Sequence, residues 1–226
     1  MPYVPSKKTD GKSTDREVIC EAVDILACQA ASRITDNRSL IKVYSDIFIK
    51  TARTLSWLIQ GGRIQECELA PDHLAGTIFL VAKKYDYAGA ELGEFNYAIT
   101  KLIQQVPQIK VARGDWKETD EFRYWLYACT ASALVYASRH TEDLGIGLDG
   151  VFIDIKDEYK WKVNRPYEAA QILKSGDCYY APYYTRLVEM ANESGEVIGH
   201  MDILLKRDAS TLSKDVLDWQ LVLKKK

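Results

Sequence analysis

Apolar residues recur at helical spacing along the first three quarters of the chain. Leu40, Val43 and Ile47, for example, lie three or four residues apart and therefore share one face of a helix. Such a stripe is wide enough to face a core when it continues over several turns. The pattern predicts five helices, over Thr14–Ala30, Ser39–Gly62, Pro71–Ala88, Gly89–Val106 and Thr119–His140.

The residues at the ends of these segments agree with helix boundaries. Thr14 and Glu17 have the spacing of a capping box, in which each side chain bonds a free backbone amide of the first turn. Ser39 is a good N-cap for the second helix, and Gly61 is a good residue to end it. Pro107 has no N–H to donate, so we expect the fourth helix to end before it.

The segment 145–173 fits two kinds of element. VFIDI, at 151–155, alternates apolar and polar residues as a strand does. Phe152, Ile155 and Tyr159 also fit one helical stripe, and the charged residues between them are good helix formers. The sequence favours a helix here, bent or interrupted near Pro166.

The last quarter has a different pattern. NESG, at 192–195, separates two apolar runs in the manner of a hairpin turn. The predicted fold is therefore mainly α: a helical bundle of about six helices with a small β-containing C-terminal appendage. We expect a polar N-terminal arm over 1–13, a helical body over 14–178 and a C-terminal lobe over 179–226.

Composition and charge narrow the classes of function. The chain has 226 residues, a formal net charge of −2 and a pI near 6.0. A chain without a global basic field has no general attraction for anionic polymers, which disfavours nucleic acid as a partner. No stretch approaches the apolar length of a membrane span, and the start lacks the apolar core of a signal peptide. These features predict a cytoplasmic protein with no membrane partner.

Cysteine and histidine patterns give little support for catalysis. The five cysteines show no CxxC pair, and the three histidines show no H-E-x-x-H pattern. Cys20, Cys28 and Cys129 lie in apolar helical runs, where a small buried thiol is expected. The sequence therefore predicts no disulfide framework, no catalytic residue and no cofactor.

Paired carboxylates are the strongest enzymatic signal. Glu91 and Glu94 are three residues apart on the fourth predicted helix, and Glu118 and Glu121 repeat this spacing at the fifth. Carboxylates at this spacing share a helix face and could jointly hold Mg²⁺ against a diphosphate, as all-α nucleotide pyrophosphohydrolases do. Acidic residues also gather in first turns simply because they favour the helix dipole. The magnesium site is therefore an alternative hypothesis.

Tyrosines gather after the sixth predicted helix. CYYAPYY places Tyr179, Tyr180, Tyr183 and Tyr184 around a proline. Tyrosine combines apolar area with a hydroxyl, so such a cluster is typical of a recognition surface. It is equally typical of a contact between two lobes of one protein.

Two segments resemble sequence blocks of one family. GEFNYAITKLI, at 93–103, is similar to G-[ED]-L-N-Y-A-I-T-x-L. KDEYKWKVNRPYEAAQILKSGDCY, at 156–179, is similar to K-L-E-F-Y-R-R-V-V-A-P-Y-E followed by N-G-D-V-Y. The family consists of small proteins of unknown function in tailed phages and bacteria. Its members commonly begin M-P-Y-I, and the start of this chain, MPYV, is similar. The similarity covers about a third of the chain and departs from the blocks at Phe95, Arg165, Ser175 and Cys178.

The resemblance implies a helical fold and a phage-like origin, and it names no reaction. It also groups polar residues of the two blocks as one candidate site. Because buried polar groups need hydrogen-bond partners, we expect this group to form an internal network or to line a ligand or partner pocket. The grouped residues are Asn96, Tyr97, Thr100, Glu158, Tyr159, Tyr167, Glu168 and Asp177.

The preferred hypothesis is a non-enzymatic, phage-like accessory protein that binds a host protein or a small nucleotide-like ligand in the host cytoplasm. The first alternative is a magnesium-dependent all-α hydrolase that uses the four paired glutamates. The second is a structural or assembly protein that forms homo-oligomers through its tyrosine-rich segment and C-terminal lobe.

Overall fold

The computed structural model describes residues 15–64, 70–85, 88–169, 183–191, 197–206 and 220–221. The chain divides into two compact units, residues 1–170 and residues 171–226, and each is described by itself. The predicted N-terminal arm, the Thr14 cap, the predicted boundary after residue 178 and the NESG turn lie outside the described residues.

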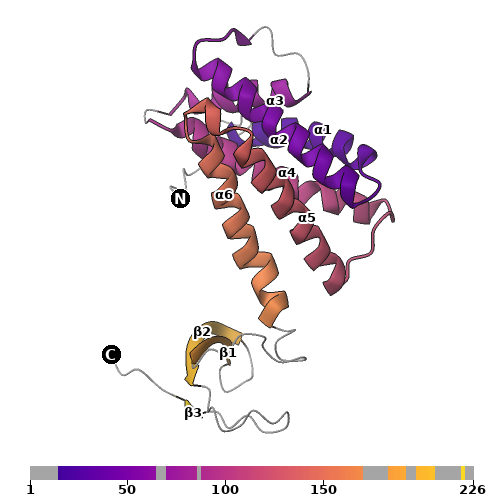
Figure 1. Ribbon diagram of the computed structural model, residues 1–226, viewed down its shortest axis with the longest axis vertical. Coiled ribbons are helices and arrows are strands. Elements are labelled where there is room, and N and C mark those ends of the chain that lie inside the picture. The colour runs from indigo at the N-terminus through magenta and orange to yellow at the C-terminus, as the bar shows by residue number, and fades with distance from the viewer. Residues whose placement is uncertain are drawn as a thin grey trace. The chain divides into compact units, whose positions relative to one another are not determined.

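Helices make up most of the described part of the first unit, which confirms the predicted class and the predicted number of about six. Figure 1 shows these helices lying alongside one another as a bundle. A 3₁₀-helix, η2 (Glu142–Leu144), and a π-helix, η3 (Lys160–Asn164), complete the described part of this unit. The α-helices are α1 (Asp15–Arg33), α2 (Asn37–Ile59), α3 (Ala70–Ala82), α4 (Ala90–Ala112), α5 (Asp120–Arg139) and α6 (Leu148–Tyr159).

Three aromatic rings from different helices meet in the centre of the core. The ring centroid of Phe152 on α6 lies 5.8 Å from that of Phe48 on α2 and 5.4 Å from that of Phe95 on α4. All three side chains are fully buried. Edge-to-face and tilted ring pairs at these distances add to the stabilisation that burial alone provides. The centre of the bundle is therefore set by α2, α4 and α6 together.

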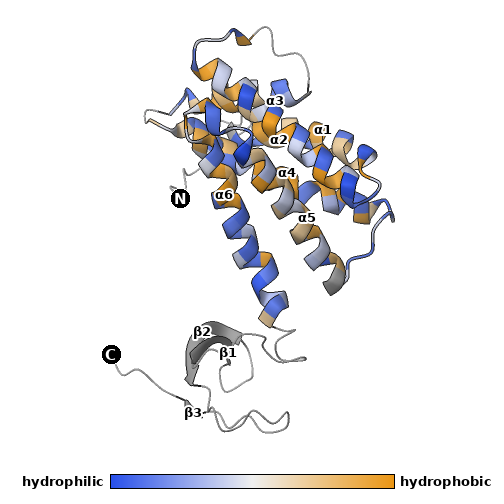
Figure 2. Cartoon of the chain, in the orientation of Figure 1, coloured by the Kyte–Doolittle hydropathy of each residue, from blue (hydrophilic) through white to orange (hydrophobic). Residues whose placement is uncertain are grey.

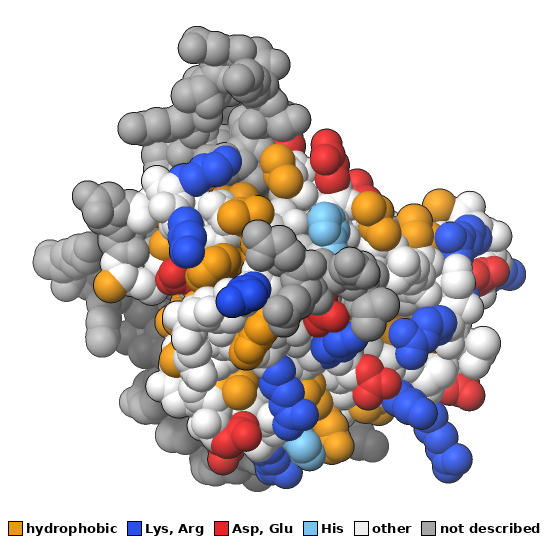
Figure 3. Space-filling view, turned by 90° about the horizontal axis from the view of Figure 1, so that it is seen from above, with side chains coloured by type: hydrophobic (Ala, Val, Ile, Leu, Met, Phe, Trp, Pro, Cys, Tyr) orange, Lys and Arg blue, Asp and Glu red, His pale blue; other side chains and the backbone are white. Residues whose placement is uncertain are grey.

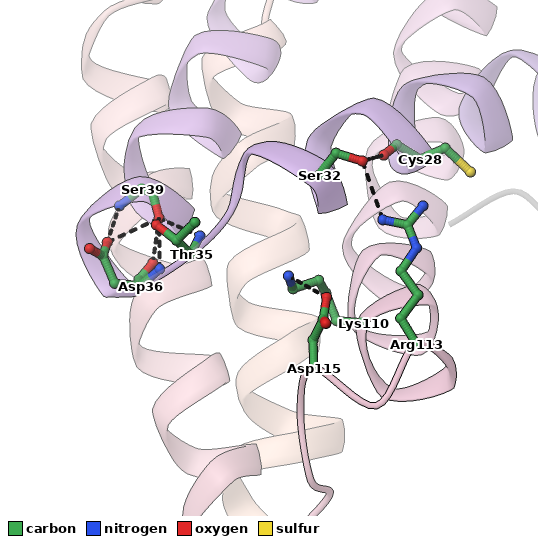
Figure 4. Close-up of polar contacts among 8 residues, drawn as sticks. All are labelled: Cys28, Ser32, Thr35, Asp36, Ser39, Lys110, Arg113 and Asp115. Carbon is green, nitrogen blue, oxygen red and sulfur yellow. Dashed lines mark hydrogen bonds and ion pairs between the residues drawn. The ribbon is translucent and has the colours of Figure 1, made fainter.

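The start of α2 corrects one predicted boundary. Asp36, rather than Ser39, is the N-cap, and its carboxylate accepts a hydrogen bond of 2.8 Å from the Ser39 amide. Ser39 completes the capping box from the third helical position, because its hydroxyl accepts from the Asp36 amide at 2.8 Å (Figure 4). The sequence pattern was ambiguous because both residues are good N-caps.

This cap makes stability depend on pH. The Ser39 amide, and then its hydroxyl, lower the pKa of Asp36 below its ordinary value of 3.8. A carboxyl with a lowered pKa stabilises the fold above its unfolded pKa and loses this effect as pH falls through the folded pKa. We expect Asp36→Ala to lower the melting temperature near neutral pH and to have a smaller effect at about pH 2. Calorimetry of both chains tests this; an equal difference at both pH values would contradict it.

Pro107 does not end α4, so that prediction is wrong. The helix continues to Ala112 with the proline inside it. Residues on both sides of the proline are buried, including Val106 and Lys110, and the Lys110 ammonium lies 2.7 Å from the Asp115 carboxylate (Figure 4). These contacts stabilise the last turns and outweigh the lost hydrogen bond.

The segment 148–169 is helical throughout, so the structure confirms the interpretation that the sequence favoured. Its predicted interruption takes the form of the π-helix η3, which lies directly before Pro166. The Arg165 amide donates to the Lys160 carbonyl, five residues earlier, and this is the hydrogen bond of a π-turn. Pro166 cannot donate to the Lys162 carbonyl, so the regular α pattern is already broken at this place.

The predicted burial of Cys28 is wrong. Cys28 is exposed on α1, whereas Cys129 is buried and Cys20 is half-buried. Val18 and Ile25 on α1 are exposed too, so apolar side chains of this helix lie outside the core that the described residues form. An apolar run along the sequence therefore overstated the burial of this helix.

Backbone pairing defines the described part of the second unit. Strand β1 (Tyr183–Ala191) pairs antiparallel with β2 (Val197–Lys206), which also pairs antiparallel with β3 (Gln220–Leu221). Val188 lies opposite Met201 in the first pair. All other residues of 171–226 lie outside the described part, so the β-containing appendage stays a prediction.

The surface charges and the apolar character of the described helices agree with the near-zero net charge and the lack of a long apolar stretch in the sequence. Figure 3 shows Lys, Arg, Asp and Glu side chains interspersed on the face that it presents, with no broad patch of one sign among the described residues there. Within the described ranges, no helix combines the length and apolar character needed to cross a membrane.

Candidate functional site

An exposed tryptophan stands at the π-helix η3. Trp161 is 62% exposed, the largest exposed fraction among the large apolar side chains of the described residues. The Arg165 guanidinium carbon lies 3.7 Å from the centre of the indole ring, so the cation covers part of one ring face. Lys160 and Lys162 flank the tryptophan and are both exposed. These four residues, Lys160, Trp161, Lys162 and Arg165, are called the Trp161 surface below.

The backbone pattern explains why this indole points away from the core. The apolar stripe of α6 contains Phe152 and Ile155, which are both buried. Trp161 lies two residues beyond Tyr159, which continues that stripe, and two residues correspond to a half-turn of the helix. Figure 2 accordingly shows the C-terminal half of this helical segment as mostly hydrophilic.

Two tyrosine pairs hold the opposite side of the segment against α5. The Tyr127 and Tyr159 ring centroids are 5.7 Å apart, and the Tyr124 and Tyr167 rings stack at 5.1 Å. Burial raises the pKa of Tyr159 to about 12. Burial also raises the pKa of Tyr127, and the negative charge of Glu168 adds to that effect. Both hydroxyls therefore stay protonated at neutral pH and act as packing groups with a polar tip.

Asn164 fixes the end of the π-helix. The residue is 2% exposed, and its side-chain amide donates a 2.7 Å hydrogen bond to the Glu168 carboxylate. Its side-chain oxygen has no hydrogen-bond partner among the described residues. Charge-assisted hydrogen bonds such as this are stronger than neutral ones, so the turn that carries Arg165 is well anchored.

Glu158 faces the exposed side of the same segment. Its carboxylate lies 2.5 Å from the Lys162 ammonium, one helical turn further on. Thus four of the predicted site residues, Glu158, Tyr159, Tyr167 and Glu168, do lie together around η3.

The other predicted group lies at a different interface. Tyr97 on α4 contacts α1, where its hydroxyl is 3.3 Å from the Cys20 sulfur and its ring lies under the Arg16 guanidinium at 4.7 Å. Burial, then the contact with Cys20, raises the pKa of Tyr97 to about 12. Asn96 is buried and accepts a 3.4 Å hydrogen bond from the Thr100 hydroxyl.

No hydrogen bond or ion pair among the described residues joins the Asn96 group to the Glu158 group. The geometry of α4 gives the reason. Phe95 is the α4 residue whose ring contacts Phe152 of α6, and each next residue on a helix is turned by about 100°. Asn96 and Tyr97 are therefore directed away from α6. The expected single polar site is two separate groups in the structure.

None of the contacts described above involves Asp177 or the four tyrosines of the proposed partner surface. Asp177, Tyr179 and Tyr180 lie outside the described residues. Tyr183 and Tyr184 belong to β1, and only their backbone is described. Their roles stay predictions.

The paired glutamates do not converge. Glu94 is 1% exposed and lies 4.0 Å from the Arg16 guanidinium, whereas Glu118 accepts from Arg123 at 2.7 Å. Glu118 lines the same pocket as Pro107, which is thirteen residues beyond Glu94 on α4. This separation is about 20 Å along the helix axis, far beyond the ~4 Å between two metals that share a substrate.

Glu91 belongs to the first turn of α4 with Glu94, and the side chain of Glu121 lies outside the described residues. No group of three or more His, Cys, Asp or Glu side chains is placed to hold a metal ion within the described part of the chain. The described residues therefore give no support to the four-glutamate magnesium site of the hydrolase hypothesis.

The sequence interpretation missed Trp161. The signal was present, because the tryptophan lies off the apolar stripe and between two lysines, with an arginine one turn later. An aromatic residue in such a polar setting predicts exposure.

Comparison with known proteins identifies no family and no function for this chain. The chain matches no protein-family model, no curated protein and no solved structure.

Proposed function

We propose that this chain is a non-enzymatic binding protein that recognises an acidic partner protein through the Trp161 surface. The observation that carries the proposal is the 62% exposed indole of Trp161, held by the Arg165 guanidinium at 3.7 Å. Tryptophan and arginine are the residues most enriched among those that dominate the energy of protein–protein interfaces.

Preorganisation favours this surface as a recognition site. The stacking of Arg165 restricts both side chains before a partner arrives, so less rotational freedom is lost on binding. The backbone beneath is equally fixed, because Asn164 bonds Glu168 and Tyr167 stacks on Tyr124. A rigid aromatic group on a fixed backbone is what a strong contact residue requires.

Charge indicates the kind of partner. Lys160, Lys162 and Arg165 surround the indole, and two carboxylates lie close to them. Glu158 pairs with Lys162 and Asp157 pairs with Lys156, so Lys160 and Arg165 are the cations beside the indole that form no ion pair among the described residues. A local excess of positive charge attracts an acidic surface and raises the rate of encounter. The overall charge of −2 confines this attraction to the local surface.

A nucleotide-like ligand is the other class that stacking and cations would suit. The openness of the indole disfavours it, because a ring that is 62% exposed offers stacking without enclosing the ligand. A protein partner, by contrast, covers an open surface with its own residues and removes water from around the central contact.

The resemblance to the phage and bacterial family supports the wider proposal. The Trp161 surface lies inside the second similar block, at 156–179. We infer a phage-like accessory role, a host protein as the partner and the host cytoplasm as the location. The predicted β-containing appendage, with Tyr179, Tyr180, Tyr183 and Tyr184, is proposed as a second contact region.

Replacing Trp161 tests the proposal directly. Binding of a fluorescent peptide library, half acidic and half neutral in composition, would be measured for the full chain. We expect acidic peptides with an apolar residue to bind, and Trp161→Ala to weaken that binding about 30-fold or more, the effect of a residue that dominates an interface. The melting temperature should change little, because the indole is exposed.

Two controls make the result specific. Leu80→Ala removes another exposed apolar side chain, 53% exposed on α3, and should leave peptide binding unchanged. Arg165→Glu reverses one charge and should shift the preference towards basic peptides. If nucleotides bound saturably instead of peptides, and Trp161→Ala abolished this binding, the ligand would be a nucleotide rather than an acidic protein. Peptide binding that survives Trp161→Ala would overturn the proposal. A molecular mass in solution that rises with protein concentration would instead support self-association, the structural or assembly alternative.

A further inference from the structure

A pocket of about 310 Å³ opens between the C-terminal half of α4 and the first turns of α5. Five apolar residues form most of its wall: Pro107, Val111, Ala112, Phe122 and Leu126. A cavity of about 150 Å³ is enough to hold benzene. The pocket therefore has room for a fused two-ring molecule, and it shares no residue with the Trp161 surface.

The aromatic wall of the pocket is rigid. Phe122 packs against Trp116 and Trp125 at centroid distances of 5.3 and 5.5 Å, and the two tryptophans meet edge to face at 5.8 Å. Lys110 lies 5.6 Å from the Trp116 ring and pairs with Asp115 at 2.7 Å, which fixes the turn after α4. A wall built in this way exists before any ligand enters.

Pro107 is an unusual residue for this wall. It cannot donate to the Ile103 carbonyl, four residues earlier, and a proline inside a helix costs about 3 kcal/mol. Local rules of stability are commonly broken where function requires it. A ring that is fixed to the backbone supplies a smooth apolar surface that a flexible side chain would not.

The mouth of the pocket carries one ion pair. Arg123 donates from Nε at 3.0 Å and from Nη2 at 2.7 Å to the same oxygen of the Glu118 carboxylate, Oε1. The two charges offset each other, so the pocket has no net charge to hold an ion. The second carboxylate oxygen, Oε2, takes part in neither of these two bonds with Arg123.

We propose that this pocket between α4 and α5 binds a small neutral molecule with an apolar two-ring body and a hydroxyl or amide donor. The ring body lies against Phe122, Val111 and Pro107. The donor bonds the Glu118 carboxylate at the mouth. A carboxylate in place of the donor is disfavoured, because it has no proton to donate to the Glu118 carboxylate and the apolar walls do not solvate it.

Three probes of one shape test the site: 2-naphthalenemethanol, 2-naphthoate and naphthalene, each titrated into the full chain by ligand-observed NMR. We expect 2-naphthalenemethanol to bind with a Kd of about 1 mM or tighter, as its number of atoms permits. Binding of 2-naphthoate should be at least about tenfold weaker.

Two matched variants assign the binding to this pocket. Ala112→Phe places a ring in the pocket from an exposed position, and it should abolish binding of 2-naphthalenemethanol. Ala128→Phe makes the same change at an exposed position of α5 that does not line the pocket, and it should leave binding unchanged. Three results would overturn the proposal: no saturation by 2-naphthalenemethanol, equal binding in Ala112→Phe, or preference for 2-naphthoate.

Discussion

Phe152→Ala is expected to lower the free energy of unfolding by about 3–5 kcal/mol, the usual cost of removing a fully buried phenylalanine ring. The Phe152 ring is fully buried and contacts Phe48 and Phe95 from two other helices. Its removal loses apolar burial and two ring contacts, and it leaves a cavity that three packed helices cannot close. Urea denaturation followed by circular dichroism measures the change.

The matched control is Leu80→Ala, which removes an exposed apolar side chain and should change the free energy of unfolding by about 0.5 kcal/mol or less. Phe152→Leu should lie between the two because it keeps most of the apolar volume. A loss below about 1 kcal/mol for Phe152→Ala would show that this ring is not central to the core.

Pro107→Ala is expected to raise the free energy of unfolding by about 1–2 kcal/mol. The new amide can donate to the Ile103 carbonyl, which regains the bond worth most of the ~3 kcal/mol helix penalty of proline. The unfolded chain gains freedom when proline is removed, and this offsets about 1 kcal/mol of the gain. Thermal and urea unfolding of the full chain would measure the difference.

Pro107→Gly separates the restored hydrogen bond from helix propensity. It also supplies an amide, but glycine is about 1 kcal/mol poorer than alanine inside a helix. The Pro107→Ala chain should therefore be more stable than the Pro107→Gly chain. If Pro107→Ala were less stable than the natural chain, the proline ring would contribute more through its packing than it costs through its missing amide.

The helices could be predicted from the sequence because their determinants are local. The spacing of Leu40, Val43 and Ile47 defines a face whatever the rest of the chain does, and all three residues are buried in the structure. The helical character of 148–159 was also readable, since Phe152 and Ile155 fit one stripe. Local rules failed where they competed, as at Pro107, where burial of the surrounding helix outweighs the missing hydrogen bond.

The candidate site was only partly readable. The second block located Glu158, Tyr159, Tyr167 and Glu168, which do lie together around η3. The exposure of Trp161 was missed, although its place off the apolar stripe and between two lysines indicated it.

What the sequence by itself determined is the set of helices and their apolar faces, since both follow from contacts between residues three or four positions apart. Only the tertiary structure decided which faces meet. Phe95 contacts α6 and Tyr97 contacts α1, so the polar residues of the first block were separated from those of the second. The same packing left Trp161 exposed and formed the pocket beside Pro107. Such pairings join residues far apart in the chain, and their choice depends on how all the helices fill one core together.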